Sequence, residues 1–229
     1  SLRVFQKDIE IIIDFDPDLY TEFYGDAARL QQILLNLIGN AIKFTEEGEI
    51  TLKTKLLKEE MVEKIRFEIK DTGIGIPPEK QQQIFESFVQ ADTSTRRRYG
   101  GSGLGLYISR KLVNLMGGNL ELDSTEGIGS TFSFTIDLEK TSPKRLKDIE
   151  PSSDTRDKTY MVFTNSFSFR NTISTWFNQW NIEHYIFSDF EEMQQEIDNI
   201  MSLASRSILI FDDVYGTTDL ISMLKELQN

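Results

Sequence analysis

The chain has 229 residues, a formal net charge of −12, 39% apolar residues, one histidine and no cysteine. The negative charge disfavours nucleic acid and anionic membrane surfaces as partners. The missing cysteines exclude disulfides, thiolate metal sites and a Cys nucleophile, and the lone His184 nearly excludes His-rich metal sites and Ser-His-Asp triads.

The sequence shows neither a membrane span nor an export signal. No apolar run approaches the roughly 20 residues that cross a bilayer, and no signal peptide is visible. The chain begins at Ser1, without Met, directly on a strand-like run. We therefore expect a cytoplasmic fragment of a longer protein, and whether the full-length protein is membrane-anchored stays open.

Up to residue 138, the hydrophobic pattern predicts both strands and helices. Apolar residues alternate in the strands and recur with helical spacing elsewhere. Strands are expected at 8–15, 49–57, 63–70, 119–124 and 130–138, and helices at 26–45, 77–88 and 105–116. The strands 49–57 and 63–70 are expected to form an antiparallel hairpin.

The helix over 26–45 carries an unusual pattern. Asp26 occupies the N-cap position. One side is apolar, with Leu30, Ile33, Leu34, Leu37 and Ala41, and a narrow polar stripe holds Arg29, Gln32, Asn36, Asn40 and Lys43. A solvated face would be wider and richer in Glu and Lys. The stripe is therefore typical of a cleft with a polar floor, and an ordinary packed helix with hydrogen-bonded Asn residues is the alternative.

After residue 138 the composition changes. Residues 141–157 are polar and contain prolines, which predicts a linker between two domains. Strands are then expected at 160–164, 183–187 and 207–211, and helices at 169–180 and 190–201. Alternation of strand and helix argues for a parallel sheet.

Asp71 follows a strand and precedes Gly73 and Gly75. A carboxylate there can hold a flat ring through an exocyclic amine, because the glycines let a ligand approach the backbone. A plain turn is one alternative. The catalytic tripeptide of aspartic proteases is another, but that chemistry needs two carboxylates and the chain has a single Asp-Thr-Gly.

The stretch from Gly100 to Leu106 is rich in glycine and opens a helix. It is not a P-loop, because it lacks the Lys-Ser/Thr ending, and it does not follow a strand as a Rossmann fingerprint does. Glycines before a helix offer free amides and the positive end of the helix dipole to a phosphate. A merely flexible loop is the alternative.

These stretches occur together in an order that resembles the sensor histidine kinase family. The segments 36–44 (NLIGNAIKF), 71–75 (DTGIG) and 101–105 (GSGLG) resemble the N, G1 and G2 boxes, 85–88 (FESF) looks like the F box, and 129–132 (GSTF) matches a motif on the last strand pair. The resemblance implies an α/β fold over 1–140. This is the Bergerat two-layer α/β sandwich, with a mixed sheet on one side, three helices on the other and ATP between them.

The resemblance also implies roles for individual residues. Asn40 and Asn36 would hold Mg²⁺ through amide oxygens. Lys43 and Arg97 would contact phosphate, Phe44 would line the adenine side, and Thr131 would support the base through water. Asp71 would accept from the adenine amine beside Gly73, Gly75 and Ile76, and the mobile lid 90–105 would lead into the phosphate loop of Gly101, Ser102, Gly103, Leu104, Gly105 and Leu106.

The implied reaction is phosphoryl transfer from Mg-ATP to a histidine, in which Asn36, Lys43 and Arg97 are the expected catalytic residues. The family's acceptor His lies on a helical dimerisation domain, which this sequence lacks, and His184 is expected to be structural. Partners would be that domain, a response regulator and, in the full-length protein, a second copy. A non-catalytic nucleotide-sensing module and a gyrase-type ATPase are the alternatives, and Asn36 replaces the general-base Glu of such ATPases.

Residues 158–229 resemble the first half of a response-regulator receiver, a partial flavodoxin-like domain with parallel strands. Asp213, or else Asp212, is placed where the phosphoaccepting Asp belongs. Receivers carry an acidic pair after the first strand to bind Mg²⁺, whereas this chain has Thr164 and Asn165. We expect a degenerate, regulatory receiver-like domain, and a remnant without a role is the alternative.

Overall fold

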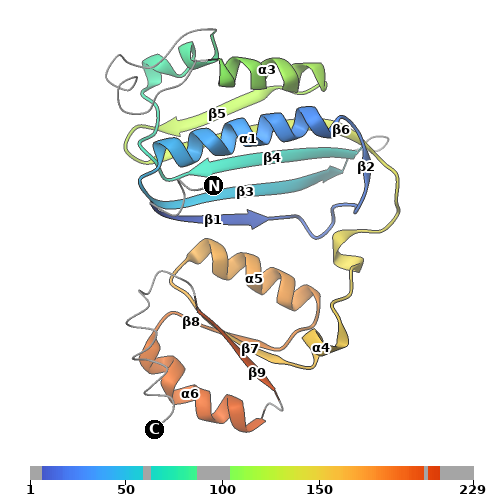
Figure 1. The fold of residues 1–229 in the computed structure, drawn as a ribbon, viewed down its shortest axis with the longest axis vertical. Coiled ribbons are helices and arrows are strands. Elements are labelled where there is room, and N and C mark those ends of the chain that lie inside the picture. Colours follow the sequence, from blue (N-terminus) through green and yellow to red (C-terminus); the bar gives the residue numbers. More distant parts are fainter. Residues whose placement is uncertain (1–6, 59–62, 87–103, 204–205, 212–229) are drawn as a thin grey trace. The chain divides into compact units, whose positions relative to one another are not determined.

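The computed structural model describes residues 7–58, 63–86, 104–203 and 206–211 (Figure 1). The chain divides into two compact units, residues 1–146 and 147–229, which we call unit 1 and unit 2. Within the described ranges, no helix combines the length and the apolar character needed to cross a membrane.

Unit 1 contains a mixed sheet with the strand order β1-β3-β4-β6-β2. Its strands are β1 (Asp8–Asp14), β2 (Phe23–Tyr24), β3 (Glu47–Lys58), β4 (Glu63–Asp71), β5 (Leu120–Thr125) and β6 (Gly129–Lys140). β1 pairs with β3 in parallel, the other pairs are antiparallel, and β5 pairs with the first half of β6. The hairpin predicted for β3 and β4 is confirmed.

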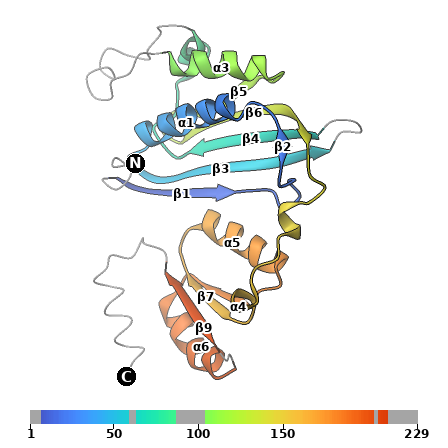
Figure 2. The same cartoon turned by 45° about the vertical axis from the view of Figure 1, so that its right-hand side comes forward.

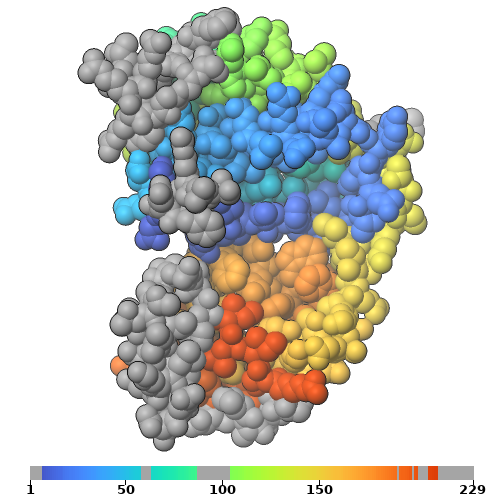
Figure 3. All heavy atoms as spheres, viewed as in Figure 1, coloured from blue at the N-terminus to red at the C-terminus, as the bar shows by residue number. Residues whose placement is uncertain are grey.

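Two helices cover one face of this sheet, α1 (Ala27–Phe44) and α3 (Gly105–Leu115) (Figure 1). Ile33 and Leu37 of α1 and Val113 of α3 are fully buried in the core, where the rings of Phe67 and Phe134 stack 5.0 Å apart. The outer side of both helices remains at the surface, which Figure 3 shows for α1 in blue and α3 in green. Unit 1 is therefore the predicted two-layer sandwich, although its described residues contain two α-helices where the resemblance implied three.

The helix predicted for 77–88 is wrong over the described residues 78–86. They form two short 3₁₀ turns, η2 (Pro78–Lys80) and η3 (Gln83–Phe85). The amide of Lys80 donates to the carbonyl of Pro77, and that of Glu86 to the carbonyl of Gln83. The side chain of Gln81 also donates to the carbonyls of Ile76 and Ser124, both at 2.9 Å, which holds the segment against β5 instead of in a regular helix.

Unit 2 contains a parallel sheet in the order β8-β7-β9. Its elements are α4 (Ser153–Arg156), β7 (Thr159–Phe163), α5 (Phe167–Gln179), β8 (His184–Phe187), α6 (Phe190–Leu203) and β9 (Ser207–Phe211). Residues from α5 and α6 belong to separate buried clusters, one with Tyr160 and Val162 and the other with Met161 and Phe163. Because these pairs alternate along β7, the two helices cover opposite faces of the sheet (Figure 2).

The residues expected to link the two domains are partly structured. The amide of Thr141 donates to the carbonyl of Glu22, and that of Leu146 to the carbonyl of Leu19 at 2.7 Å, so 141–146 pack against the segment before α1 and belong to unit 1. The 3₁₀ turn η4 (Leu146–Asp148) and the short helix α4 follow.

Candidate functional site

The polar stripe of α1 meets the start of α3. The side-chain amide of Asn36 donates to the hydroxyl of Ser109 at 2.8 Å. A β-carbon at Gly105 would collide with the amide oxygen of Asn36, so glycine at this position lets the Asn36 side chain lie where it does. Asn36 therefore lies beside the first turn of α3.

That first turn has no side-chain cap. Leu104 occupies the N-cap position, and its side chain cannot accept a hydrogen bond from the helix amides. The first turn also contains no acidic residue. Uncapped amides and the positive end of the helix dipole make this end suited to an anion.

Asp71 is the last residue of β4 and is only 6% exposed. Its Oδ1 accepts from the backbone N–H of Gly73 at 2.9 Å. Burial raises the pKa of this carboxyl above its ordinary value, and hydrogen bonds from the backbone of Gly73 and Ser130 partly oppose that effect. A buried carboxylate with spare acceptor capacity gains from a donor that a ligand brings.

The glycines after Asp71 are required by their surroundings. A β-carbon at Gly73 would lie 2.5 Å from the carbonyl oxygen of Phe44, and Gly75 has φ +66°. The amide of Ile74 donates to the same carbonyl of Phe44 at 3.3 Å. The loop is thus joined to the C-terminal end of α1, and the ring of Phe44 lies 4.7 Å from the ammonium group of Lys43.

The structure corrects the residue predicted to stand beside this carboxylate on β6. Ser130 is the partner of Asp71 in the ladder, whereas Thr131 is the partner of Lys70. Because side chains alternate between faces, Thr131 lies on the face opposite to Asp71. The Oγ of buried Ser130 lies 3.0 Å from the Oγ of Ser124. The Oγ of Ser124 also accepts from the backbone N–H of Ile76 at 2.8 Å.

Lys7 is a residue that the sequence analysis missed. Its ammonium group lies at the C-terminal end of α1 and donates to the carbonyls of Ile42 and Thr45 at 3.0 and 2.7 Å. A cation there satisfies carbonyls that have no partner within the helix. No local pattern pointed to it, because Lys7 and Thr45 are far apart in the chain.

The described part of the chain thus brings together a large share of the predicted site. Asn36, Gly105 and the first turn of α3 form one side, and Phe44, Asp71, Gly73, Gly75 and Ile76 form another. Asn40 and Lys43 continue the α1 stripe, half-buried. Arg97, Gly101, Ser102, Gly103 and Asp213 lie outside the described residues.

No cluster of three or more His, Cys, Asp or Glu side chains suited to a metal occurs in the described ranges. His184 makes its contacts within unit 2. Its Nδ1 lies 2.9 Å from the carbonyl oxygen of Ile182, and its ring centroid lies 5.3 Å from the ring centroid of Phe177.

Comparison with known proteins places residues 25–140, about half of the chain, in one family. They match the family described as histidine kinase-, DNA gyrase B- and HSP90-like ATPase. The matched range begins just before α1 and ends with β6, so it spans every described residue assembled above except Lys7.

Similar curated proteins are histidine kinases. The chain is 43% identical over 137 residues to hybrid signal transduction histidine kinase B of Dictyostelium discoideum, and 43% identical over 162 residues to the signal transduction histidine-protein kinase BarA of Escherichia coli K12. The alignments cover 59% and 64% of this chain but only 7% and 18% of those proteins.

A solved structure of full-length ShkA in complex with AMPPNP shares the fold of this chain. The TM-score is 0.66 at 22% identity, and the match covers 100% of this chain and 54% of that one.

Proposed function

Because the chain belongs to the histidine kinase-, DNA gyrase B- and HSP90-like ATPase family, we propose that residues 1–140 are the ATP-binding catalytic module of a hybrid sensor histidine kinase. This module transfers the γ-phosphoryl group of ATP to a histidine on a dimerisation domain outside this sequence. The observation that carries the proposal is the arrangement of three elements, in which the middle of α1, the end of β4 and the start of α3 present Asn36, Asp71 and Gly105.

Asp71 fits the recognition of an adenine amine. Its carboxylate is buried, and it already accepts from the backbone N–H of Gly73. An exocyclic amine would add a donor where burial otherwise disfavours the charge. The backbone at Gly73 and Gly75 carries no side chain that would block a flat ring.

The residues present also fit phosphates and Mg²⁺. The amide oxygen of Asn36 faces Gly105, where the uncapped amides of α3 begin. Hard amide oxygens from Asn36 and Asn40 suit Mg²⁺, which when bound neutralises charge on the phosphates. Lys43, Arg97 and the backbone of the segment 101–106 would supply further positive charge and donors.

The residue types favour phosphoryl transfer over hydrolysis. Phosphoryl transfer depends mainly on positioning and charge neutralisation, and the acceptor imidazole supplies the nucleophile. Gyrase-type ATPases carry a general-base Glu where this chain has Asn36. The side-chain N–H of Asn36 donates to Ser109, which leaves the amide oxygen available as a ligand, and an amide at this position cannot act as a general base on water.

We further propose that residues 158–229 are a degenerate receiver-like domain that follows a linker at 141–157. The strand order β8-β7-β9 is the parallel 2-1-3 order of flavodoxin-like folds. Thr164 and Asn165 follow β7, and Arg170 donates to the carbonyl of Thr164 at 3.3 Å. A guanidinium at this position opposes binding of a divalent cation. The prediction is that Asp213 is not phosphorylated by an active phosphodonor.

The test of the kinase proposal is calorimetric titration of the full chain with a non-hydrolysable ATP analogue, with and without Mg²⁺. We expect Mg²⁺-dependent binding that Asn40→Ala weakens at least about tenfold, since it removes a charge-assisted contact. Asp123→Asn is a matched control, because Asp123 is exposed on β5 and is the ladder partner of Thr131 on the far face.

Transfer itself is tested by adding a dimerisation domain from a related histidine kinase and radiolabelled ATP. Label on the acceptor histidine, lost in Asn40→Ala, supports the kinase. Nucleotide binding without transfer to any acceptor would support a nucleotide-sensing module instead. Steady release of phosphate without an acceptor would support an ATPase.

A further inference from the structure

Unit 1 has a second site at the end of the sandwich opposite to Asp71. A cavity of about 390 Å³ lies between the first turn of α1, the C-terminal end of α3 and the sheet. Its walls include the rings of Phe15, Tyr20, Phe23 and Phe67. The cavity is thus largely aromatic and apolar, unlike the nucleotide end.

The polar side chains among the described lining residues already have partners. Asp26 accepts from the amide of Arg29 and forms an ion pair with its guanidinium at 3.0 Å. The Oγ of Thr54 accepts from the amide of Asp16 at 3.3 Å. A charged ligand would therefore lose hydration without gaining a free partner, and the lining favours a neutral, apolar one.

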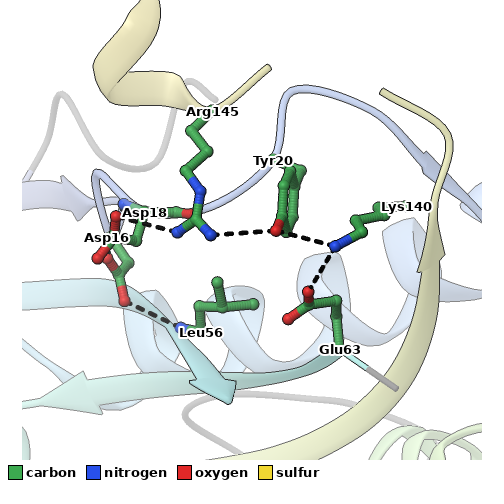
Figure 4. Close-up of polar contacts among 7 residues, drawn as sticks. All are labelled: Asp16, Asp18, Tyr20, Leu56, Glu63, Lys140 and Arg145. Atoms are coloured by element: carbon green, nitrogen blue, oxygen red, sulfur yellow. Dashed lines mark hydrogen bonds and ion pairs between the residues drawn. The ribbon is translucent and has the colours of Figure 1, made fainter. Parts of the chain in front are cut away.

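A network of polar contacts surrounds Tyr20, which is one of the residues that line the cavity (Figure 4). The hydroxyl of Tyr20 accepts from Lys140 Nζ at 3.0 Å and from Arg145 Nη2 at 3.1 Å. Arg145 also donates to Asp18, and Lys140 to Glu63. These contacts tie the segment before α1 to the end of β6 and to Arg145 beyond it, so they fix the position of Tyr20 in the wall of the cavity.

The volume sets the size of the occupant. An apolar cavity of about 150 Å³ stays dry and binds benzene, so this one has room for about ten to fifteen non-hydrogen atoms. That is the size of a fused two-ring aromatic molecule. A nucleotide would bring phosphate charges that the lining cannot pair, and a folded peptide segment would be too large.

The two helices connect this cavity with the nucleotide end. Leu30 lines the cavity and Asn36 lies further along α1, while Met116, at the C-cap of α3, lines the cavity and Gly105 begins that helix. An occupant bound between the first turn of α1 and the C-terminal end of α3 would shift both helices, and Asn36 and Gly105 would move with them. By linkage, the nucleotide and the occupant would then change each other's affinity by the same factor.

We propose that this cavity is a binding site for one small neutral aromatic molecule, and that its occupancy alters nucleotide affinity. The second half of this statement rests on the proposed nucleotide function, whereas the first half does not.

The experiment uses the full chain with ¹³C-labelled methionine methyl groups and 2-naphthol as the probe. We expect a saturable shift of the Met116 methyl signal, while Met161 and Met193, buried in unit 2, stay unchanged. Absence of a saturable Met116 shift would overturn the site. An apparent Kd of the probe that rises without limit as ADP is raised would place the probe at the nucleotide end and would also overturn the proposal, whereas coupling between two sites gives a change that reaches a plateau.

Matched variants locate the probe. Ala27 and Ala28 are both exposed, but only Ala27 lines the cavity. Ala27→Phe is expected to weaken 2-naphthol binding at least tenfold, and Ala28→Phe to leave it unchanged; equal binding by both would overturn the assignment. ATP-analogue affinity is then titrated with and without saturating probe. A several-fold change supports the coupling, and an unchanged affinity overturns the coupling alone.

Discussion

The two ends of unit 1 share helices α1 and α3 and the strands β4 and β6, yet they differ in chemistry. At the end with Asp71, glycines bring backbone groups together and leave helix amides uncapped. At the end with Tyr20, aromatic rings surround a cavity and the polar groups are paired with each other. In our two proposals, the end with Asp71 therefore binds a charged ligand and the end with Tyr20 binds an apolar one.

Each end of unit 1 contains a different feature that costs folding free energy. The nucleotide end keeps a buried carboxyl whose pKa is raised by burial, which is unfavourable until a donor arrives. The cavity end keeps apolar surface without full packing, which is unfavourable until an apolar group fills it. Each cost is a reason to expect a ligand at that end.

Gly105→Ala should have the largest effect of these variants on stability and on ATP-analogue binding, and it should leave the cavity end unchanged. A β-carbon there collides with the side-chain oxygen of Asn36, so we expect a stability loss of about 1–3 kcal/mol from overpacking and at least about tenfold weaker ATP-analogue binding, because the Asn36 side chain must turn away from its position in the site. Gly39→Ala in α1 is the control, since its β-carbon would meet nothing within 4 Å. It should stabilise the helix by about 0.5–1 kcal/mol. Urea denaturation and calorimetry measure both; unchanged binding by Gly105→Ala would contradict the close approach.

Asp71→Asn should alter the pH dependence of stability. Burial raises the pKa of Asp71 in the folded state above the ordinary 3.8, so the folded protein holds this proton more tightly than the unfolded chain. The difference in unfolding free energy between wild type and variant should therefore fall as the pH rises from the ordinary pKa to the raised pKa of Asp71. The total fall is about 1.4 kcal/mol for each unit by which the pKa is raised, and above the raised pKa the difference should stay constant. Paired urea unfolding between pH 4 and 8 measures this, and a rising difference would refute the sign.

Tyr20→Phe tests the cavity end. The variant keeps the ring but removes the acceptor of Lys140 and Arg145, and we expect a loss of about 0.5–1.5 kcal/mol in unfolding free energy. Tyr24→Phe is the matched control because Tyr24 is 75% exposed on β2, and it should stay within about 0.5 kcal/mol of wild type. Equal effects from both would mean that the network does not hold this end together.

The smallest expected effect separates Ser130 from Thr131. Ser130→Ala removes a buried hydroxyl that lies 3.0 Å from that of Ser124, beside Asp71. We expect roughly three- to tenfold weaker ATP-analogue binding, the size of about one neutral hydrogen bond. Thr131→Ala should bind like wild type, because its side chain lies on the opposite face. If calorimetry shows weaker ATP-analogue binding for Thr131→Ala than for Ser130→Ala, Thr131 rather than Ser130 contacts the nucleotide.

Hydrophobic periodicity and the N, G1 and G2 motifs predicted the two-layer sandwich and the group of residues around Asp71. α1, the β3–β4 hairpin and α3 were found within a few residues of their predicted bounds, because each has a long regular pattern and a local start or stop signal. The 77–88 segment was misjudged, since contacts of Gln81 with Ile76 and Ser124 outweighed its local pattern.

By itself, the sequence determined the long regular helices and strands, the order of the motifs and the residue types suited to a nucleotide. Only the tertiary structure decided that Ser130 rather than Thr131 stands beside Asp71, that Lys7 caps α1, and that the segments 15–30 and 138–146 enclose a cavity. The reason is physical. Periodicity and capping act over a few residues, whereas strand register, long-range caps and unfilled volume arise when segments distant in the chain pack together.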